Sequence, residues 1–110
     1  MTKADLVYLI QDNILKNNSD IRKREVSHKI INCIIDSFFD VLKEYMARGE
    51  HIELRGFGTF GTKVRKSKKA INPRTKEVLS VPVHAVPIFK PGKELKQLVK
   101  EYYEADSRKW

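Results

Sequence analysis

The sequence predicts an α+β fold: a helical N-terminal body, a small antiparallel sheet that extends into a β-ribbon arm, and a C-terminal helix. Three observations lead to this prediction. Apolar residues recur at helical spacing up to about residue 46. Two strand-like segments then flank a short turn-forming stretch, and a further amphipathic helical pattern begins near residue 91.

The first helix is expected near residues 3–16. Thr2 precedes Asp5 by three residues, which is the spacing of a capping box. The apolar residues at helical spacing are Leu6, Val7, Ile10 and Ile14. The stretch NNSD at 17–20 consists of residues that favour turns and caps, so it predicts a break. Residues 21–26 could form one extra turn.

The second helix is predicted by its phase. At about 100° per residue, apolar side chains fill about 180° of its surface and polar side chains fill the rest. The apolar set is Ile30, Ile31, Ile34, Ile35, Phe38, Phe39, Val41, Leu42, Tyr45 and Met46. The same phase places the start of the helix near Ser27, which we expect to be its N-cap, and Arg48 with Gly49 should end it. Cys33 falls on the polar side as an incidental thiol.

The apolar arc of this helix is wider than the roughly 100° stripe of an ordinary surface helix. The short first helix cannot cover it. Large apolar residues on both flanks favour an obligate dimer in which two copies interlock, although a sheet from the same chain could also cover one side.

The segment after the second helix predicts strands. HIELR at 51–55 alternates polar and apolar residues as a half-buried strand does. The glycines of GFGTFG at 56–61 match the pattern of dinucleotide-binding loops, but that assignment requires a following helix, and TKVRKSKK at 62–69 has no helical periodicity. The glycines instead predict a tight turn, with Phe57 and Phe60 packed into the core.

Two extended limbs form the predicted arm. One runs from Phe57 to about Lys69, the tip occupies 70–76, and EVLSVPVHAVPIF returns to Phe89. Each limb has about 13 residues, so at about 3.3 Å per residue the hairpin could reach about 40 Å. Two short helices cannot cover that length, so the distal half should protrude. The prolines of the second limb are tolerated because an edge ribbon need not supply every amide; they are Pro82 and Pro87.

The last helix is predicted from KPGKELKQLVKEYY, in which Pro91 is placed at the helix start. Its apolar face consists of Leu95, Leu98, Val99 and Tyr102. Residues 104–110 are expected to be frayed or specific to this protein. The whole chain is thus read as one domain, with a helical dimerisation region at 1–50, the sheet and arm at 51–90, the last helix at 91–104 and a tail at 105–110.

Positive charge is concentrated in the arm. The chain has a net charge of +8, and residues 61–76 contain seven of its 22 cations and no acid. These cations are Lys63, Arg65, Lys66, Lys68, Lys69, Arg74 and Lys76. A polyanion should therefore touch this segment first, the alternative being a solvated basic loop kept for solubility.

The apolar tip of the arm needs a separate explanation. Lys and Arg on an extended ribbon can follow a nucleic-acid backbone and release counterions, but this does not require a proline. Pro73 could slide between base pairs in the minor groove and kink the duplex. It could also be an ordinary turn residue, since Asn-Pro often opens a turn. The residues alone leave both functions open.

Three ordered motifs then point to a family. GFGTF at 56–60, NPRT at 72–75 and FKPGKEL at 89–95, following two helices, resemble the HU/IHF family of bacterial nucleoid-associated, histone-like DNA-bending proteins. The resemblance covers roughly residues 1–100. It implies an HU/IHF-like intertwined dimer whose two arms embrace DNA. This family is itself among the examples from which the apolar-wedge mechanism is known.

The resemblance also implies roles for individual residues. Pro73 corresponds to the intercalating proline, Lys90 and Lys93 to phosphate contacts, and Lys3 with Arg55 to contacts from the body. The full expected DNA-binding set is Lys3, Arg55, Lys63, Arg65, Lys66, Lys68, Lys69, Ile71, Asn72, Pro73, Arg74, Thr75, Lys76, Lys90 and Lys93.

Two positions depart from the family pattern. Ile71 stands where an arginine usually reaches into the minor groove, so base reading should weaken while wedging persists or grows. Lys76 replaces a common glycine, which removes the residue that most easily adopts positive φ and adds charge.

The expected function is an architectural protein that binds duplex DNA through the minor groove, largely without sequence specificity, and bends and compacts it. The alternatives are an IHF-like protein with site preference and a module that binds RNA or an acidic partner. No catalytic grouping or metal-ligand spacing occurs in one motif, so neither enzyme activity nor a cofactor is expected. A homodimer is expected, with a heterodimer left open. Without a signal peptide or a membrane-spanning segment, the cytoplasm is the expected compartment.

Overall fold

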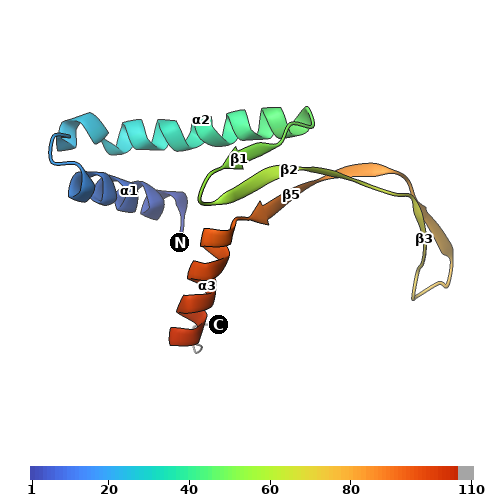
Figure 1. The fold of residues 1–110 in the computed structure, drawn as a ribbon. Helices are drawn as coiled ribbons and strands as arrows, with labels where there is room; N and C mark the ends of the chain where they lie inside the picture. The colour runs from blue at the N-terminus through green and yellow to red at the C-terminus, as the bar shows by residue number, and fades with distance from the viewer. Residues whose placement is uncertain (107–110) are drawn as a thin grey trace. The chain divides into compact units, whose positions relative to one another are not determined.

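The structure, a computed structural model, describes residues 1–106. The chain divides into two compact units, one of residues 1–43 and a second that begins at Glu44. Along the chain the elements are α1 (Lys3–Asn17), the 3-10 helix η1 (Lys23–Val26), α2 (His28–Ala47), β1 (Ile52–Leu54), β2 (Gly58–Arg65), β3 (Lys68–Ile71), β4 (Val78–Val81), β5 (His84–Pro91) and α3 (Lys93–Ala105) (Figure 1). None of the helices described is long and apolar enough to span a bilayer.

The first unit contains α1, η1 and most of α2. The Thr2 backbone amide donates to the Asp5 carboxylate at 2.8 Å, which confirms the predicted start of α1. The extra turn expected within residues 21–26 is η1. The buried Gln11 side chain donates through Nε2 to the Val26 carbonyl at 2.9 Å, while its Oε1 lies 3.0 Å from Nε2 of His28. Gln11 therefore ties α1 to η1 and to the first residue of α2.

Helix α2 begins and ends where the sequence predicts. The Ile30 amide donates to Oγ of Ser27 at 3.2 Å, so Ser27 is the N-cap. At the other end Gly49 has φ of +83°, and the Glu50 amide donates back to the Tyr45 carbonyl at 3.0 Å. This left-handed residue turns the chain out of the helix, which is the usual reason for glycine just after a C-terminus.

Most of the apolar arc of α2 remains open to solvent. Among the residues described, the buried hydrophobic side chains are Val7, Ile31 and Leu42. The exposed apolar side chains of α2 are Ile30, Ile34, Phe38, Phe39, Val41 and Tyr45. Cys33 is exposed as well. A helix with this much uncovered apolar surface lacks the packing that normally stabilises an amphipathic helix.

The second unit is built on a three-stranded antiparallel sheet in the order β1-β2-β5. Gly56, with φ of +84°, forms the turn between β1 and β2, and strand β2 follows it where a dinucleotide-binding loop would need a helix. A Cβ atom on Gly58 would lie 2.5 Å from the Lys90 carbonyl oxygen and 2.7 Å from the Phe89 ring. Glycine is therefore required at position 58 by the close approach of β5.

Three aromatic rings pack together on this sheet. The Phe89 ring centroid lies 4.6 Å from that of Phe60 and 5.3 Å from that of Phe57. Phe57 nevertheless remains 45% exposed. The prediction that Phe57 packs into the core is therefore wrong, because its ring contacts the cluster on one side and stays open to solvent on the other.

The arm is one hairpin interrupted midway. Arg65 pairs with His84 and Lys68 with Val81, so two residues on each strand face each other across the interruption with no insertion. One of these is Pro82, which has no amide to donate to a ladder. The register continues beyond Ile71, because the Asn72 amide donates to the Glu77 carbonyl at 2.9 Å. The predicted limb end at Lys69 and tip at 70–76 are thus wrong, and the loop occupies 72–77.

Helix α3 begins later than predicted. Pro91 is the last residue of β5, paired with Gly58, and is not the helix start. The N-cap is Gly92, whose amide donates to the Phe57 carbonyl at 2.8 Å and so belongs to the packing of the sheet. The helix continues through Ala105, so residues 104–105 are helical and not frayed. The rest of the predicted tail, 107–110, lies outside the described residues.

Candidate nucleic-acid interface

The tip of the arm is a turn held by its own polar side chains. Oδ1 of Asn72 accepts a hydrogen bond from the Arg74 amide at 2.9 Å, and the Asn72 carbonyl accepts one from the Lys76 amide at 2.7 Å. Oγ1 of Thr75 accepts a hydrogen bond from the Glu77 amide at 3.4 Å. Pro73 lies at the exposed start of this loop with its φ fixed by its ring. These hydrogen bonds brace the loop that carries Pro73.

Lys76 carries the strained backbone of this turn. Its φ is +60°, and among the non-glycine residues described it alone has positive φ. The left-handed region costs a residue with a Cβ about 1–2 kcal/mol. The expectation that lysine is an unfavourable replacement for glycine here is consistent with this geometry.

An apolar pair lies directly behind the tip. Ile71 and Val78 are opposite each other in the last pair of the β3–β4 ladder, so their side chains share one face. Ile71 is 68% exposed and Val78 is 64% exposed. Together with Pro73 they give the end of the arm an apolar surface with no cover within the described residues.

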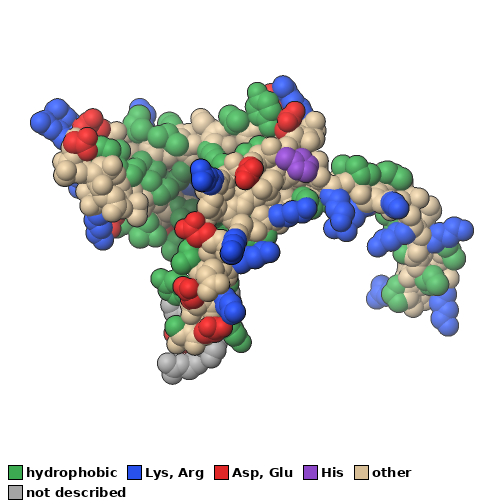
Figure 2. Space-filling view, viewed as in Figure 1, with side chains coloured by type: hydrophobic (Ala, Val, Ile, Leu, Met, Phe, Trp, Pro, Cys, Tyr) green, Lys and Arg blue, Asp and Glu red, His purple; other side chains and the backbone are tan. Residues whose placement is uncertain are grey.

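Cations follow the arm on both sides of the interruption. In β2, Lys63 and Arg65 lie two residues apart and so point to the same face of the sheet, and Lys90 joins them there because its partner Thr59 has the same parity. In β3, Lys68 and Lys69 point to opposite faces, and Lys66 lies within the interruption. Figure 2 shows Lys and Arg side chains spread along the whole arm. All of these cations are exposed.

The base of the arm brings Lys90 and two further predicted residues onto connected segments. Arg55 lies in the β1–β2 turn, while Lys90 and Lys93 flank the junction of β5 and α3. One hydrogen bond joins this turn to this junction, from the Gly92 amide to the Phe57 carbonyl at 2.8 Å, and the Gly56 backbone approaches Glu94 so closely that an added Cβ would lie 3.0 Å from its Oε2. The glycines of both motifs therefore hold the segments that carry these cations.

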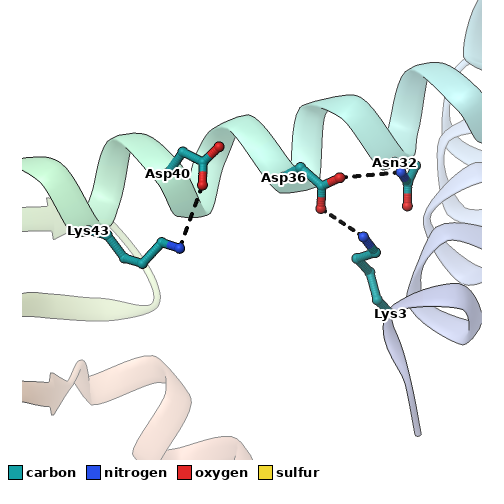
Figure 3. Close-up of polar contacts among 5 residues, drawn as sticks. All are labelled: Lys3, Asn32, Asp36, Asp40 and Lys43. Atoms are coloured by element: carbon teal, nitrogen blue, oxygen red, sulfur yellow. Dashed lines mark hydrogen bonds and ion pairs between the residues drawn. The ribbon is translucent and has the colours of Figure 1, made fainter.

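Lys3 belongs to the first unit, whereas the other predicted residues belong to the second. Its Nζ lies 2.8 Å from Oδ1 of Asp36 on α2, and both side chains are half exposed (Figure 3). A phosphate contact by Lys3 would have to replace or share this ion pair. Among residues 1–106, no three His, Cys, Asp or Glu side chains are grouped to hold a metal ion.

Comparisons with known proteins match this architecture. Residues 1–100 match the family described as "Bacterial DNA-binding protein". A DNA-binding protein HU from Thermotoga maritima is 34% identical over 91% of this chain and 100% of its own length. Another HU, from Clostridium pasteurianum, is 35% identical over 90% of this chain and 98% of its own length.

The chain belongs to the HU/IHF family of bacterial DNA-binding proteins. Among solved structures, a cocrystal of Anabaena HU with DNA matches with a TM-score of 0.68 and 25% identity, over 90% of this chain and 97% of that one. A solution structure of a mutant transcription factor 1 matches in fold with a TM-score of 0.61 and 23% identity, over 98% of this chain and 99% of that one.

HU/IHF membership confirms the predicted family and the α+β fold. HU/IHF proteins are architectural DNA-binding proteins and not enzymes.

One candidate DNA-contacting residue on the arm was missed in the sequence analysis. His84 pairs with Arg65 on the cationic face of β2 and β5, and its Nδ1 lies 2.9 Å from the Pro82 carbonyl oxygen. Counting the register back from the Asn72–Glu77 pair would have found it.

Proposed function

We propose that this protein binds duplex DNA through the minor groove, largely without sequence preference, and bends and compacts it. The arm carries this proposal: a two-stranded ribbon with exposed cations along its length ends in an exposed proline on a side-chain-supported turn. Exposed cations favour a polyanion, and an apolar tip favours the stacked interior of a duplex.

The residues of the arm have two roles: the cations bind phosphates, and the proline at the tip separates two stacked base pairs. Lys63, Arg65 and Lys90 on one face of the sheet bind phosphates and release counterions. Pro73, held by Asn72 and Thr75, enters a base step and partly unstacks it, which kinks the duplex. The remaining predicted contacts are Arg55, Lys66, Lys68, Lys69, Arg74, Lys76, Lys93 and, in the first unit, Lys3.

Ile71 supports binding with little base readout. An arginine at this position would donate hydrogen bonds to base edges in the minor groove, whereas isoleucine has no polar group to offer. The exposed Ile71–Val78 pair instead adds apolar area behind Pro73. This favours wedging over reading and argues against site preference of the IHF type.

The functional unit is a homodimer. The exposed apolar face of α2 includes Ile34 at 62% exposure and Phe39 at 50% exposure, far more apolar surface than a stable monomeric helix leaves open. A second copy supplies an equally apolar face, and each copy then presents one arm to the DNA. A protein that acts on the bacterial chromosome works in the cytoplasm, at the nucleoid.

Ligase-mediated closure of a DNA fragment of about 100 base pairs tests this function. Such a fragment is shorter than the persistence length of about 150 base pairs, so it rarely closes unaided. The protein should raise the yield of monomeric circles in proportion to occupancy, and on any sequence. Binding without added closure would contradict the proposal. Equal affinity for duplex RNA, without bending, would favour the general polyanion-binding alternative.

A further inference from the structure

A second group of exposed cations lies in the first unit, whereas every residue assigned to the arm and its base belongs to the second. The segment IRKREVSHK at 21–29 contains four cations and one acid. The cations are Arg22, Lys23, Arg24 and Lys29, and all four are exposed. We call this group the η1 patch.

The η1 patch differs from the other cations of its unit in having no acidic partner. Lys3, Lys16 and Lys43 form ion pairs with Asp36, Asp12 and Asp40 at 2.8, 3.0 and 3.6 Å. Within residues 1–106, no ion pair is formed by any cation of the η1 patch. The one acid of the segment, Glu25, is turned back to accept the Arg22 backbone amide at 3.0 Å. The patch therefore keeps its charge available for an external anion.

The η1 patch borders a shallow cleft with a fixed floor. The cleft has a volume of about 500 Å³ and is lined by Tyr8, Gln11, Lys23, Arg24, Ser27 and His28. Gln11 is 8% exposed, and its amide is held by the Val26 carbonyl. Because Nε2 of Gln11 is the donor in that bond, its Oε1 is an acceptor, and Nε2 of His28 must donate the hydrogen bond between them at 3.0 Å.

Aromatic contact further restricts this floor. The Tyr8 and His28 rings meet edge to face with centroids 6.0 Å apart. Two independent contacts thus fix the imidazole. The cations of η1 lie beside it on a short helix in which the Glu25 amide donates to the Arg22 carbonyl at 2.9 Å and the Val26 carbonyl accepts from Gln11. The cleft presents a stable donor-rich surface without any rearrangement of the chain.

The shape of the patch selects the kind of anion. A site for a small free anion normally encloses it with buried donors, whereas these cations are all exposed and are spread from η1 to the first turn of α2. Spaced, solvent-exposed cations around an open cleft suit the repeated phosphates of a nucleic-acid backbone.

We infer that the η1 patch is a second phosphate-binding surface, which holds a second DNA duplex while the arms hold the first. The protein then joins two duplexes as well as bending one. This function rests on the proposed binding of one duplex by the arms, and it adds residues that the bending does not use. Loss of the η1 patch should therefore abolish bridging and leave single-duplex binding and bending measurable.

Duplex bridging can be measured directly. A duplex of about 35 base pairs is fixed to beads, a fluorescent duplex of the same sequence is added in solution, and capture of fluorescence is recorded against concentration of the full-length protein. The test variant carries Lys23→Gln and Arg24→Gln. The matched control carries Lys16→Gln and Lys43→Gln, which remove the same charge from the same unit at cations that are already paired.

The wild type and the control should capture the fluorescent duplex. The test variant should lower the bridging affinity at least about tenfold near 0.1 M salt, because two phosphate contacts are lost. Its affinity for a single duplex and its bending should be unchanged. A second variant, with Arg22→Gln and Lys29→Gln, should lower bridging independently.

Three results would overturn the inference. The wild type could fail to capture a second duplex, or the test variant could capture it as well as the control. Alternatively, single-duplex affinity could fall in parallel with bridging, which would place the η1 patch on the flank of the first duplex. Retained bridging together with loss of binding to an acidic polypeptide such as polyglutamate would assign the patch to a protein partner.

Discussion

Replacing Lys76 by glycine should tighten the arm turn. Lys76 has φ of +60°, where a side chain costs about 1–2 kcal/mol and glycine costs nothing. Glycine also has more backbone entropy in the open turn, which favours opening by about 0.5–1 kcal/mol. The net stabilisation of the closed turn by Lys76→Gly is therefore about 0.5–1 kcal/mol. At 25 °C this corresponds to a roughly two- to fivefold smaller open population.

Hydrogen exchange of the full-length protein measures this change at defined amides. The Lys76 and Asn72 amides donate to the Asn72 and Glu77 carbonyls, so both are released when the turn opens. Lys76→Gly should raise their protection about two- to fivefold after correction for intrinsic exchange rates. Lys76→Ala is the matched control, because it removes the same charge but keeps the Cβ. Equal protection in the two variants would refute the argument from backbone strain.

Three further predictions concern charge, packing and assembly. If six to ten phosphates are neutralised, the logarithm of the DNA association constant should fall against the logarithm of salt concentration with a slope of roughly −5 to −9, and a nearly flat response would contradict a phosphate grip. Gly58→Ala should destabilise the protein by about 1–3 kcal/mol, seen as a lower urea midpoint at fixed protein concentration, because the new Cβ would lie 2.5 Å from the Lys90 carbonyl oxygen. Phe39 is 50% exposed, so burying the exposed half of its side chain in a dimer stabilises the dimer by about 1.5 kcal/mol per copy. Because each dimer contains two copies, Phe39→Ala should raise the dimer dissociation constant about a hundredfold, as measured by sedimentation. An unchanged dissociation constant would place the interface elsewhere.

Local signals were enough to predict the helix ends. Ser27 and Gly49 are a polar N-cap and a left-handed C-terminal residue, and each acts through bonds to its immediate neighbours. Such features depend on a few residues, so a sequence can specify them without knowledge of the fold. The same holds for the capping box at Thr2.

Strand ends depended on partners far along the chain and were predicted less well. Pro91 was assigned to a helix because proline favours a first helical turn, yet its pairing with Gly58 keeps it in β5. The tip was predicted at 70–76, whereas the Asn72–Glu77 hydrogen bond that closes the loop at 72–77 follows from the strand register. Phe57 was expected in the core beside the predicted glycine turn, and the exposed side of its ring could not be known without the sheet.

The sequence supplied candidate binding residues but not their arrangement on the arm. The run from Lys63 to Lys76 was recognisable by charge alone. The pairing of β2 with β5 was needed to show that Lys63, Arg65 and Lys90 share one face of the sheet. The same pairing places His84 beside them. The η1 patch was missed because charge was counted along the chain, and ion pairing within the first unit is what distinguishes its cations.

The most direct test of the central claim is end-to-end fluorescence transfer on a labelled duplex of about 35 base pairs, titrated with wild-type protein and with Pro73→Ala. The account predicts that transfer rises as wild type binds, because the ends of the duplex approach. Pro73→Ala should bind with nearly the same salt dependence, since no cation is lost, but should give a much smaller rise. Equal transfer with both proteins, or binding with no change in transfer, would contradict the account and leave the arm as an electrostatic grip alone.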